Sequence, residues 1–169
     1  MKQVLIGDFS VIDSDGFRFN VGIIVCNNDG GLLWCRRLGK VNAWQFPQGG
    51  IKEHEQPIEA MYRELNEELG LHEKDVVCLA ESSQWLSYIL PKELRRYQSV
   101  PLCVGQKQKW FLLRLLNGED AIKLDFSQEQ EFDRWCWIDY WEPVKRVIKF
   151  KRAVYQQVLT EFETHVKHK

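Results

Sequence analysis

The chain has 169 residues, which is enough for one compact domain and too few for two domains of ordinary size. Hydrophobic residues make up 44% of the chain and charged residues 28%, a balance that is typical of a globular protein and excludes an intrinsically disordered one. Lys and Arg total 23 and Asp and Glu total 24, so the formal net charge of −1 excludes a polycation that coats nucleic acid by charge alone.

The first elements in chain order are two strands that form a predicted β-hairpin. Residues 20–27 and 32–36 are rich in apolar and β-branched side chains, and Asn28-Asp29-Gly30-Gly31 between them is a strong turn signal. Further strands are expected over residues 76–80, 85–90, 109–116 and 134–139.

Two helices are expected. The first begins at Pro57, a favourable residue for a first helical turn, and ends at Leu69, where Gly70 permits a left-handed cap. The second covers residues 149–166. Strands on both sides of a central helix, followed by a helix at the C-terminus, predict an α/β or α+β sandwich.

The chain contains no recognisable linker or membrane segment. Its longest apolar run near the start, residues 21–26, falls far short of the ~20 residues that cross a bilayer. The five cysteines are odd in number and show no C-x-x-C spacing, so we expect reduced thiols and a cytoplasmic location. We divide the chain into an N-terminal extension, residues 1–10, and a single domain, residues 11–169.

The first predicted helix carries an unusual acidic cluster. Apolar residues recur at spacings of three and four to form one predicted buried stripe: Ile58, Met61, Tyr62, Leu65 and Leu69. At about 100° per residue, Glu64, Glu67 and Glu68 fall within a roughly 100° arc on a different face. Their mutual repulsion would be relieved by a divalent cation, and carboxylate oxygens favour Mg²⁺ or Mn²⁺. A solvated acidic face is the alternative for these glutamates taken alone.

The spacing around this cluster points to a known motif. Gly49, then Glu55, then Arg63-Glu64-Leu65, then Glu67-Glu68, and finally Gly70-Leu71 match every defined position of the Nudix box. The chain therefore resembles the Nudix hydrolases, which cleave nucleoside diphosphates linked to another moiety with the help of Mg²⁺ or Mn²⁺. This resemblance implies an α/β/α sandwich with a central mixed sheet, in agreement with the α/β (α+β) pattern of the predicted elements.

Each box residue also has a physical reason to be there. Gly49 and Gly50 let the backbone turn tightly and approach an anion or metal closely. Arg63 can pair with Glu55 or with Glu67 and hold the loop against the helix. The resemblance implies that Glu64, Glu67 and Glu68 bind metal and supply the catalytic base, and the Gly49 carbonyl is a plausible further ligand.

The flanking segments narrow the resemblance. Residues 13–22, 44–50, 105–111 and 131–133 resemble the corresponding segments of bacterial RNA 5′-pyrophosphohydrolases. That resemblance implies that Glu131 is a fourth acidic ligand or a base. It also implies contacts to the 5′ phosphates and RNA backbone from Arg18, Arg37 and Lys151, and contacts to the first bases from Tyr88 and Phe150. For Tyr88 and Phe150, core packing is the alternative.

The resemblance implies a reaction in which metal-activated water attacks an RNA 5′-triphosphate or 5′-diphosphate and leaves a 5′-monophosphate end, which promotes mRNA decay. Glu64 is the preferred base and Glu131 the second choice. The alternative enzyme is a dinucleoside-polyphosphate hydrolase, which shares the Gln48-Gly49-Gly50 sequence. A housecleaning hydrolase of free nucleotides and a non-catalytic RNA-end-binding protein are further alternatives. We expect a monomer whose partner is 5′-phosphorylated RNA, with no membrane association.

The distribution of charge fits an enzyme that holds both metal and RNA. Residues 49–75 contain eight acids and three bases, a local net charge of −5. Residues 92–114 contain six bases and one acid, and residues 145–152 contain five bases, so each segment carries +5. Basic charge interleaved with aromatic rings suits single-stranded nucleic acid. The near-zero total is thus a cancellation between an acidic segment and two basic ones.

Overall fold

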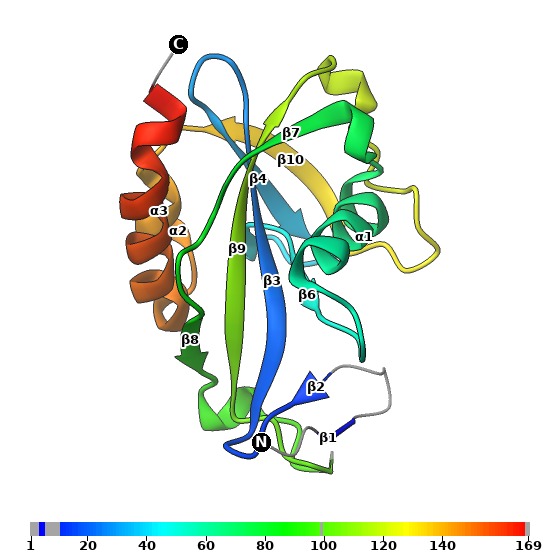
Figure 1. The fold of residues 1–169 in the computed structure, drawn as a ribbon, viewed down its shortest axis with the longest axis vertical. Helices are drawn as coiled ribbons and strands as arrows, with labels where there is room; N and C mark the ends of the chain where they lie inside the picture. Colours follow the sequence, from blue (N-terminus) through cyan, green and yellow to red (C-terminus); the bar gives the residue numbers. More distant parts are fainter. Residues whose placement is uncertain (1–3, 6–10, 99, 168–169) are drawn as a thin grey trace.

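A computed structural model describes residues 4–5, 11–98 and 100–167. A mixed β-sheet lies between helix α1 on one side and helices α2 and α3 on the other (Figure 1). The strands are β1 (Val4–Leu5), β2 (Val11–Ile12), β3 (Phe17–Cys26), β4 (Leu32–Arg37), β5 (Trp44–Gln45), β6 (Gln48–Gly50), β7 (Val76–Glu81), β8 (Leu86–Ile89), β9 (Gly105–Leu115) and β10 (Phe132–Ile138). The helices are α1 (Pro57–Leu69), α2 (Glu142–Arg146) and α3 (Arg152–Lys167). The expected sandwich with a central mixed sheet is confirmed.

Strands β3 and β9 form the centre of the sheet. They run parallel, in register from Phe17 beside Gly105 to Cys26 beside Arg114. The other pairings between described strands are antiparallel: β9 also pairs with β7 and β8, β3 with β2 and β6, and β4 with β5 and β10. Within the extension of residues 1–10, β1 pairs with β2 and adds a short strand to the edge.

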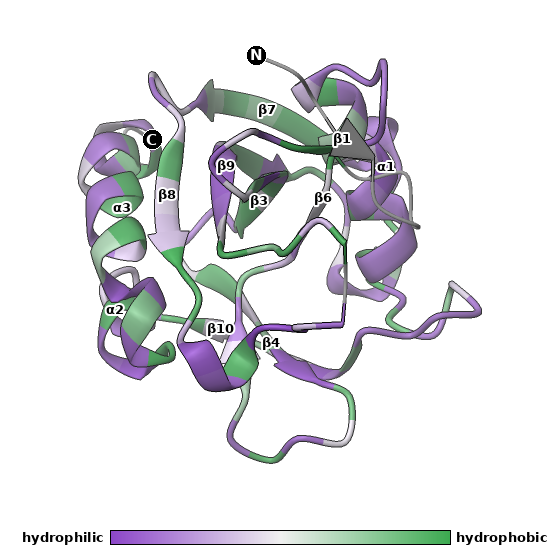
Figure 2. Ribbon diagram, turned by 90° about the horizontal axis from the view of Figure 1, so that it is seen from below, coloured by the Kyte–Doolittle hydropathy of each residue, from purple (hydrophilic) through white to green (hydrophobic). Residues whose placement is uncertain are grey.

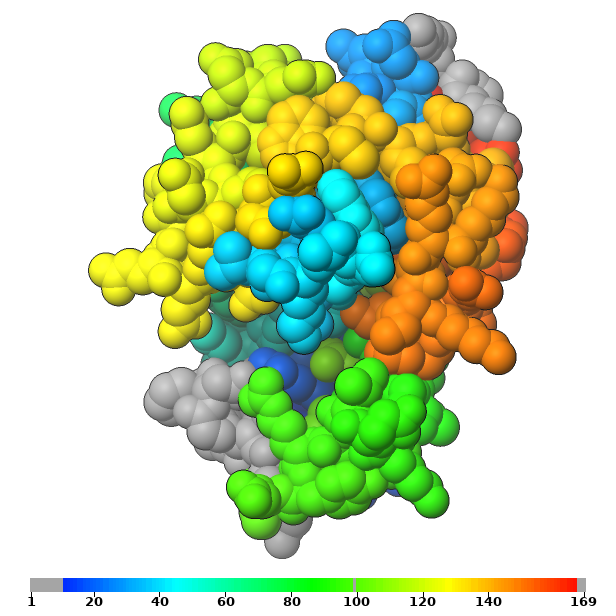
Figure 3. Space-filling view, turned by 180° about the vertical axis from the view of Figure 1, so that it is seen from behind, coloured from blue at the N-terminus to red at the C-terminus, as the bar shows by residue number. Residues whose placement is uncertain are grey.

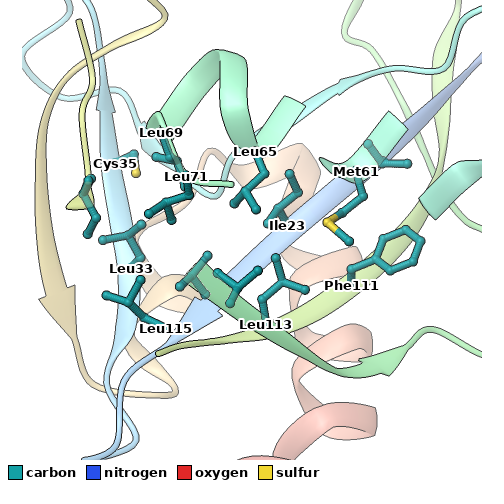
Figure 4. Packing of buried hydrophobic residues seen from close by; sticks show 14 of the residues in the cluster. Ile23, Leu33, Cys35, Met61, Leu65, Leu69, Leu71, Phe111, Leu113 and Leu115 are labelled. Carbon is teal, nitrogen blue, oxygen red and sulfur yellow. The ribbon is translucent and has the colours of Figure 1, made fainter. Parts of the chain in front are cut away.

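Alternation along the central strands builds a core on each face of the sheet. In β3, Val21, Ile23 and Val25 pack on the α1 side, whereas Ile24 and Cys26 pack on the α3 side. Figure 4 shows the first core, in which Met61, Leu65 and Leu69 of α1 lie against strand residues such as Ile23 and Leu113. The second core is rich in buried aromatic rings: Trp34, Phe46, Trp110, Tyr155 and Phe162.

The turn of the predicted hairpin is present, but its two strands do not pair along their length. Asn27 accepts hydrogen bonds from the backbone amides of Asp29 and Gly31 at its Oδ1, and Gly30 has a φ of +84°. However, β3 and β4 pair only where they meet, at Cys26 and Leu32. The strands then separate because β3 takes β9 and β6 as its neighbours. The turn signal was right about the reversal and wrong about extended pairing.

Several predicted boundaries were wrong by a few residues. Strand β3 begins at Phe17 and β9 at Gly105, each earlier than expected, because the parallel ladder continues through residues 17–19 and 105–108, which precede the apolar runs. The second predicted helix begins with a 3₁₀ turn, Lys149–Lys151, before α3. Helix α2 and the short strands β1, β2, β5 and β6 were not expected, since two to five residues carry too little periodicity to detect.

Helix α1 has the predicted bounds, and Gly70 ends it with a φ of +67°. The predicted buried stripe needs a correction. Ile58 is 44% exposed, and Ala60 is buried in its place. Glu64 and Glu68 are also buried, because the sheet-facing side of α1 extends over them, whereas Glu67 is exposed. The three glutamates therefore do not share one solvated face.

The hydropathy of the molecule follows this layering. Figure 2 shows purple, hydrophilic residues on the sides of α1 and α3 that face away from the strands, and largely green, hydrophobic residues along β7. None of the helices in the described residues combines the length and the apolar character that a membrane crossing needs.

Candidate active site

Arg63 of α1 makes several hydrogen bonds that connect the helix to the segment between β6 and α1. Its Nε and Nη2 donate to both carboxylate oxygens of Glu55, at 2.7 and 2.9 Å, and Nη2 also donates to the Gly50 carbonyl at 2.8 Å. Its Nη1 donates to Glu64 at 2.7 Å and to Glu67 at 3.3 Å. The expectation that Arg63 pairs with Glu55 or Glu67 is thus met by both residues. Arg63 fixes the loop to the helix and sets the positions of two acidic side chains.

Gly49 is required by the close approach of Glu64. A Cβ at Gly49 would lie 1.9 Å from the Glu64 carboxyl carbon, so no side chain fits there while Glu64 holds its position. At the C-terminal end of α1, the Gly70 amide donates to the Asn66 carbonyl, and the Lys123 amide donates to the Leu69 carbonyl. These bonds anchor the C-terminal end of the acidic helix.

The carboxyl groups of Glu64 and Glu68 are buried. Burial raises the pKa of the Glu64 carboxyl, and the negative charge of Glu67 adds to that effect against the opposing bond from Arg63. Burial raises the pKa of Glu68 well above its usual range, with further increases from Glu64 and Glu131. The Oε2 atom of Glu68 is buried and accepts no hydrogen bond within the described residues. Two buried, repelling carboxyls without an adequate counter-charge are costly.

This cluster fits a divalent cation by the chemistry of its donors. The unsatisfied Glu68 oxygen and the raised pKa values are what a cation would correct, and carboxylates are hard oxygen ligands of the kind that Mg²⁺ prefers. In the part of the chain that the structure describes, no three Asp, Glu, His or Cys side chains already stand in metal-binding geometry.

A cleft of about 1010 Å³ joins the acidic cluster to basic and aromatic groups. The predicted site residues that line this cleft are Arg18, Arg37, Gly49, Gly50, Arg63, Glu64, Glu67, Glu68, Tyr88, Glu131, Phe150 and Lys151. Of the predicted site residues, only Glu55 and Gly70 lie outside the lining, and both support it through α1. Figure 3 shows a hollow between the β4–β5 loop, in cyan, and the β8–β9 loop, in green, which contribute Lys40 and Arg96 respectively.

Hydrogen bonds at the end of β4 connect the segment with the basic residue Arg37 to the segment with the acidic residue Glu131. Asp133 of β10 accepts hydrogen bonds from Arg36 Nε at 2.7 Å and from the Gly39 amide at 3.1 Å. The Leu38 amide donates to the Glu131 carbonyl at 2.8 Å. These bonds join the segment that carries Arg37 to the segment that carries Glu131.

Lys151, Tyr88 and Phe150 form the aromatic side of the cleft. Lys151 is 7% exposed, and its Nζ donates to the Oε1 atoms of Gln45 and Gln48 at 3.2 Å each. Burial and, to a smaller extent, the charge of Arg37 lower the pKa of Lys151 to about 8, whereas the charge of Glu68 opposes the shift. The ring centroids of Tyr88 and Phe150 lie 5.4 Å apart. Tyr88 both packs in the second core and lines the cleft. Burial raises the pKa of its hydroxyl group to about 12.

A network of amides supports this side of the cleft. Gln48 donates from Nε2 to the Tyr88 hydroxyl at 3.4 Å, and its Oε1 accepts a bond from Gln108 at 3.2 Å. Gln108 also donates to Asn20 at 2.8 Å. Gln48 thus links β6 to Tyr88, Lys151 and the central strand β9. The local sequence contains these amides, but only the sheet register brings them together.

The sequence reasoning missed several cleft residues: Lys40, Gln45, Gln48, Leu94, Arg96 and Gln106 as lining groups, and Asp133 as the bridge to Arg36. The motif segments included Gln45, Gln48, Gln106 and Asp133 without a role for their side chains. Arg96 belongs to the basic segment 92–114, so the charge count was its only signal.

Comparison with known proteins places this geometry in context. Residues 16–158 match the NUDIX domain family. The RNA pyrophosphohydrolase of Ectopseudomonas mendocina is 57% identical over 151 residues, which cover 89% of this chain and 94% of that protein. The RNA pyrophosphohydrolase of Shewanella piezotolerans is 56% identical over 90% of this chain and 87% of its own length.

Solved structures of lower sequence identity share the fold. The E. coli dihydroneopterin triphosphate pyrophosphohydrolase superposes with a TM-score of 0.68 at 18% identity, over 85% of this chain and 95% of that one. A C. elegans Ap4A hydrolase binary complex superposes with a TM-score of 0.61 at 16% identity, over 86% and 96% of the two chains. At such low identity these likenesses concern the fold alone.

Proposed function

The chain belongs to the Nudix family, and on that premise we propose that it is an RNA 5′-pyrophosphohydrolase. The reaction converts 5′-triphosphate or 5′-diphosphate RNA ends into 5′-monophosphate ends and so promotes mRNA decay. The observation that carries this proposal is the 57% identity, over 89% of the chain, to a protein described as an RNA pyrophosphohydrolase. The cleft supports it, because an acidic cluster and basic side chains face the same space.

The acidic side of the cleft would hold the divalent cations, Mg²⁺ or Mn²⁺. Glu64, Glu67, Glu68 and Glu131 are the proposed carboxylate ligands, and the Gly49 carbonyl is the proposed backbone ligand. When bound, such cations lower the pKa of a water molecule and neutralise charge on the leaving phosphate. Glu64 and Glu68 are buried, and burial strengthens the electrostatic interactions of their carboxyl groups.

One glutamate would accept the proton of the attacking water. Glu64 is the preferred base, because burial raises the pKa of its carboxyl and Arg63 fixes its orientation. Glu131 is the second choice, since it lines the cleft from the opposite segment, just before β10. Glu64→Gln and Glu131→Gln separate the two: loss of the base should remove the alkaline rise in kcat, whereas loss of a ligand should raise the metal concentration required.

The basic and aromatic side would bind the RNA. Arg18, Arg37 and Lys151 would hold the phosphates so that the bond to be broken faces the acidic cluster. Tyr88 and Phe150 would contact the first bases, and their tilted pair offers an apolar surface against which a base can pack.

The test is hydrolysis of a 5′-triphosphorylated RNA in Mg²⁺, with identification of the released group and the new 5′ end. We expect pyrophosphate or phosphate and a 5′-monophosphate RNA, and the Glu68→Gln protein is the matched inactive control. Diadenosine tetraphosphate is tested in parallel. Faster hydrolysis of the dinucleotide than of the RNA would favour the alternative enzyme, although no feature of the cleft favours it.

Three further properties belong to the same proposal. We propose that residues 11–169 form the catalytic domain and that residues 1–10 are an extension to it. We propose a monomer, which sedimentation of the purified protein would test. We also propose a cytoplasmic enzyme, which agrees with five free cysteines and with an RNA substrate.

A further inference from the structure

Three cleft residues form a row across three neighbouring strands. Arg18 of β3 is the register partner of Gln106 of β9, and Gln106 is the register partner of Tyr88 of β8. Register partners on adjacent strands project to the same face of a sheet. All three side chains line the cleft. The row therefore presents, in order, a guanidinium, an amide and an aromatic ring to the space where substrate would lie.

The amide of Gln106 has no hydrogen-bond partner among the described residues. Its Oε1 atom is buried, and the side chain makes no hydrogen bond within the described ranges 4–5, 11–98 and 100–167. Gln108 also has an Oε1 atom without a donor, but that side chain is fully buried, is held by Asn20 and Gln48, and does not line the cleft. The Gln106 side chain lines the cleft, and a buried acceptor that receives no bond from the described residues calls for a donor from a ligand or from water.

The order of the row matches the order of groups in a nucleotide. Neighbouring strands lie about 4.8 Å apart, so the backbones of Arg18 and Tyr88 stand roughly 10 Å from one another with that of Gln106 between them. In a nucleotide the sugar lies between phosphate and base. With phosphate at Arg18 and a base at Tyr88, the sugar would lie over Gln106.

We propose that Gln106 accepts a hydrogen bond from a ribose 2′-hydroxyl and thereby selects RNA ends over 2′-deoxy ends. This inference rests on the proposed function and adds a specificity-determining residue to it. The 2′-hydroxyl is the donor that distinguishes RNA from DNA at a given site. An exocyclic amine of a base could also donate to a glutamine. The central place of Gln106 in the row favours the sugar.

The test uses four 5′-triphosphorylated oligonucleotides of one sequence: all ribose, 2′-deoxy at the first nucleotide, 2′-deoxy at the second, and 2′-fluoro at whichever position shows the larger penalty. Wild-type protein is compared with Gln106→Met, which keeps the length but removes the amide, and with Gln106→Glu, which keeps an acceptor. Gln156→Met, on the exposed side of α3 away from the cleft, is the matched control.

For the wild type, we expect kcat/KM to fall about three- to tenfold on one of the two deoxy substrates, the effect of one hydrogen bond. The 2′-fluoro substrate should show the same penalty, because fluorine cannot donate. Gln106→Met should hydrolyse the ribose and deoxy substrates equally, whereas Gln106→Glu and Gln156→Met should keep the penalty.

Two results would overturn the inference: a wild type that shows no deoxy penalty, or a penalty that survives in Gln106→Met. A fifth substrate, all ribose but without the exocyclic amine of the first base, tests the other donor: an effect of Gln106→Met that follows this amine, with the sugar penalty intact, would assign the contact to the base instead. Failure of the proposed function is a separate outcome, since in that case the wild type would leave even the all-ribose triphosphate uncut.

Discussion

Asp133 holds Arg36 by a 2.7 Å hydrogen bond, and it does so from a strand that lies almost a hundred residues further along the chain. The bond lowers the pKa of the Asp133 carboxyl, with help from the Gly39 amide. Because Arg37 follows Arg36 and Glu131 precedes Asp133 by two residues, this pair fixes the spacing between a proposed phosphate contact and a proposed metal ligand.

The first prediction concerns Asp133 itself. Asp133→Ala should lower kcat/KM on triphosphorylated RNA about tenfold, a typical effect for a supporting residue of a catalytic site. The melting temperature should change little, since both partners are partly exposed and such pairs add little stability. Asp125→Ala, an exposed carboxylate outside the cleft lining, is the control. Equal activity of the two variants would contradict the positioning role.

The second prediction contrasts two glycines. Gly49→Ala would place a Cβ against the Glu64 carboxyl, whose flexible side chain can move aside, so we expect a folded protein that loses most of its kcat. Gly22→Ala would place a Cβ 2.4 Å from the buried ring of Trp110, which cannot move, so we expect destabilisation of about 1–3 kcal/mol. Thermal unfolding and hydrolysis rates of both variants check this. A Gly49→Ala protein with full activity would show that Glu64 need not hold its position.

The third prediction concerns Glu68. Burial raises the pKa of its carboxyl above the unfolded value of about 4.3, so its contribution to stability is fully present below that pH and is lost as the pH rises through the folded-state pKa. Glu68→Gln should therefore melt a few degrees higher than the wild type at neutral pH without metal. It should also lose at least about a hundredfold in activity. A lower melting temperature for the variant would contradict the burial argument.

The fourth prediction concerns Lys151 and pH. Burial lowers its pKa to about 8, so its side chain is charged below that pH and neutral above it. The KM for triphosphorylated RNA should rise up to about tenfold between pH 7 and pH 9, since roughly nine-tenths of such a group is neutral at pH 9. Lys151→Arg, which stays charged, should show a flat KM over this range. A parallel rise in both proteins would assign the effect to another group.

Local signals in the sequence were sufficient for helix α1 and its motif. Pro57 and Gly70 mark its two ends, and the i,i+4 spacing of Arg63 and Glu67 places their side chains within reach of one another. These features depend on helix geometry over a few turns, which is the same in every protein. The apolar runs of the central strands were equally predictable, although their first residues, 17–19 and 105–108, were not predicted as strand.

Tertiary structure alone decided which distant groups share the cleft and which carboxyls are buried. The parallel register of β3 and β9 sets Arg18, Gln106 and Tyr88 in one row. Glu64 and Glu68 are buried because α1 packs on the sheet, although helical periodicity placed them on a separate face. A residue's neighbours across a sheet depend on which strands pair, and no local period encodes that choice. The sequence thus determined the family and the acidic motif, and packing determined the site that surrounds them.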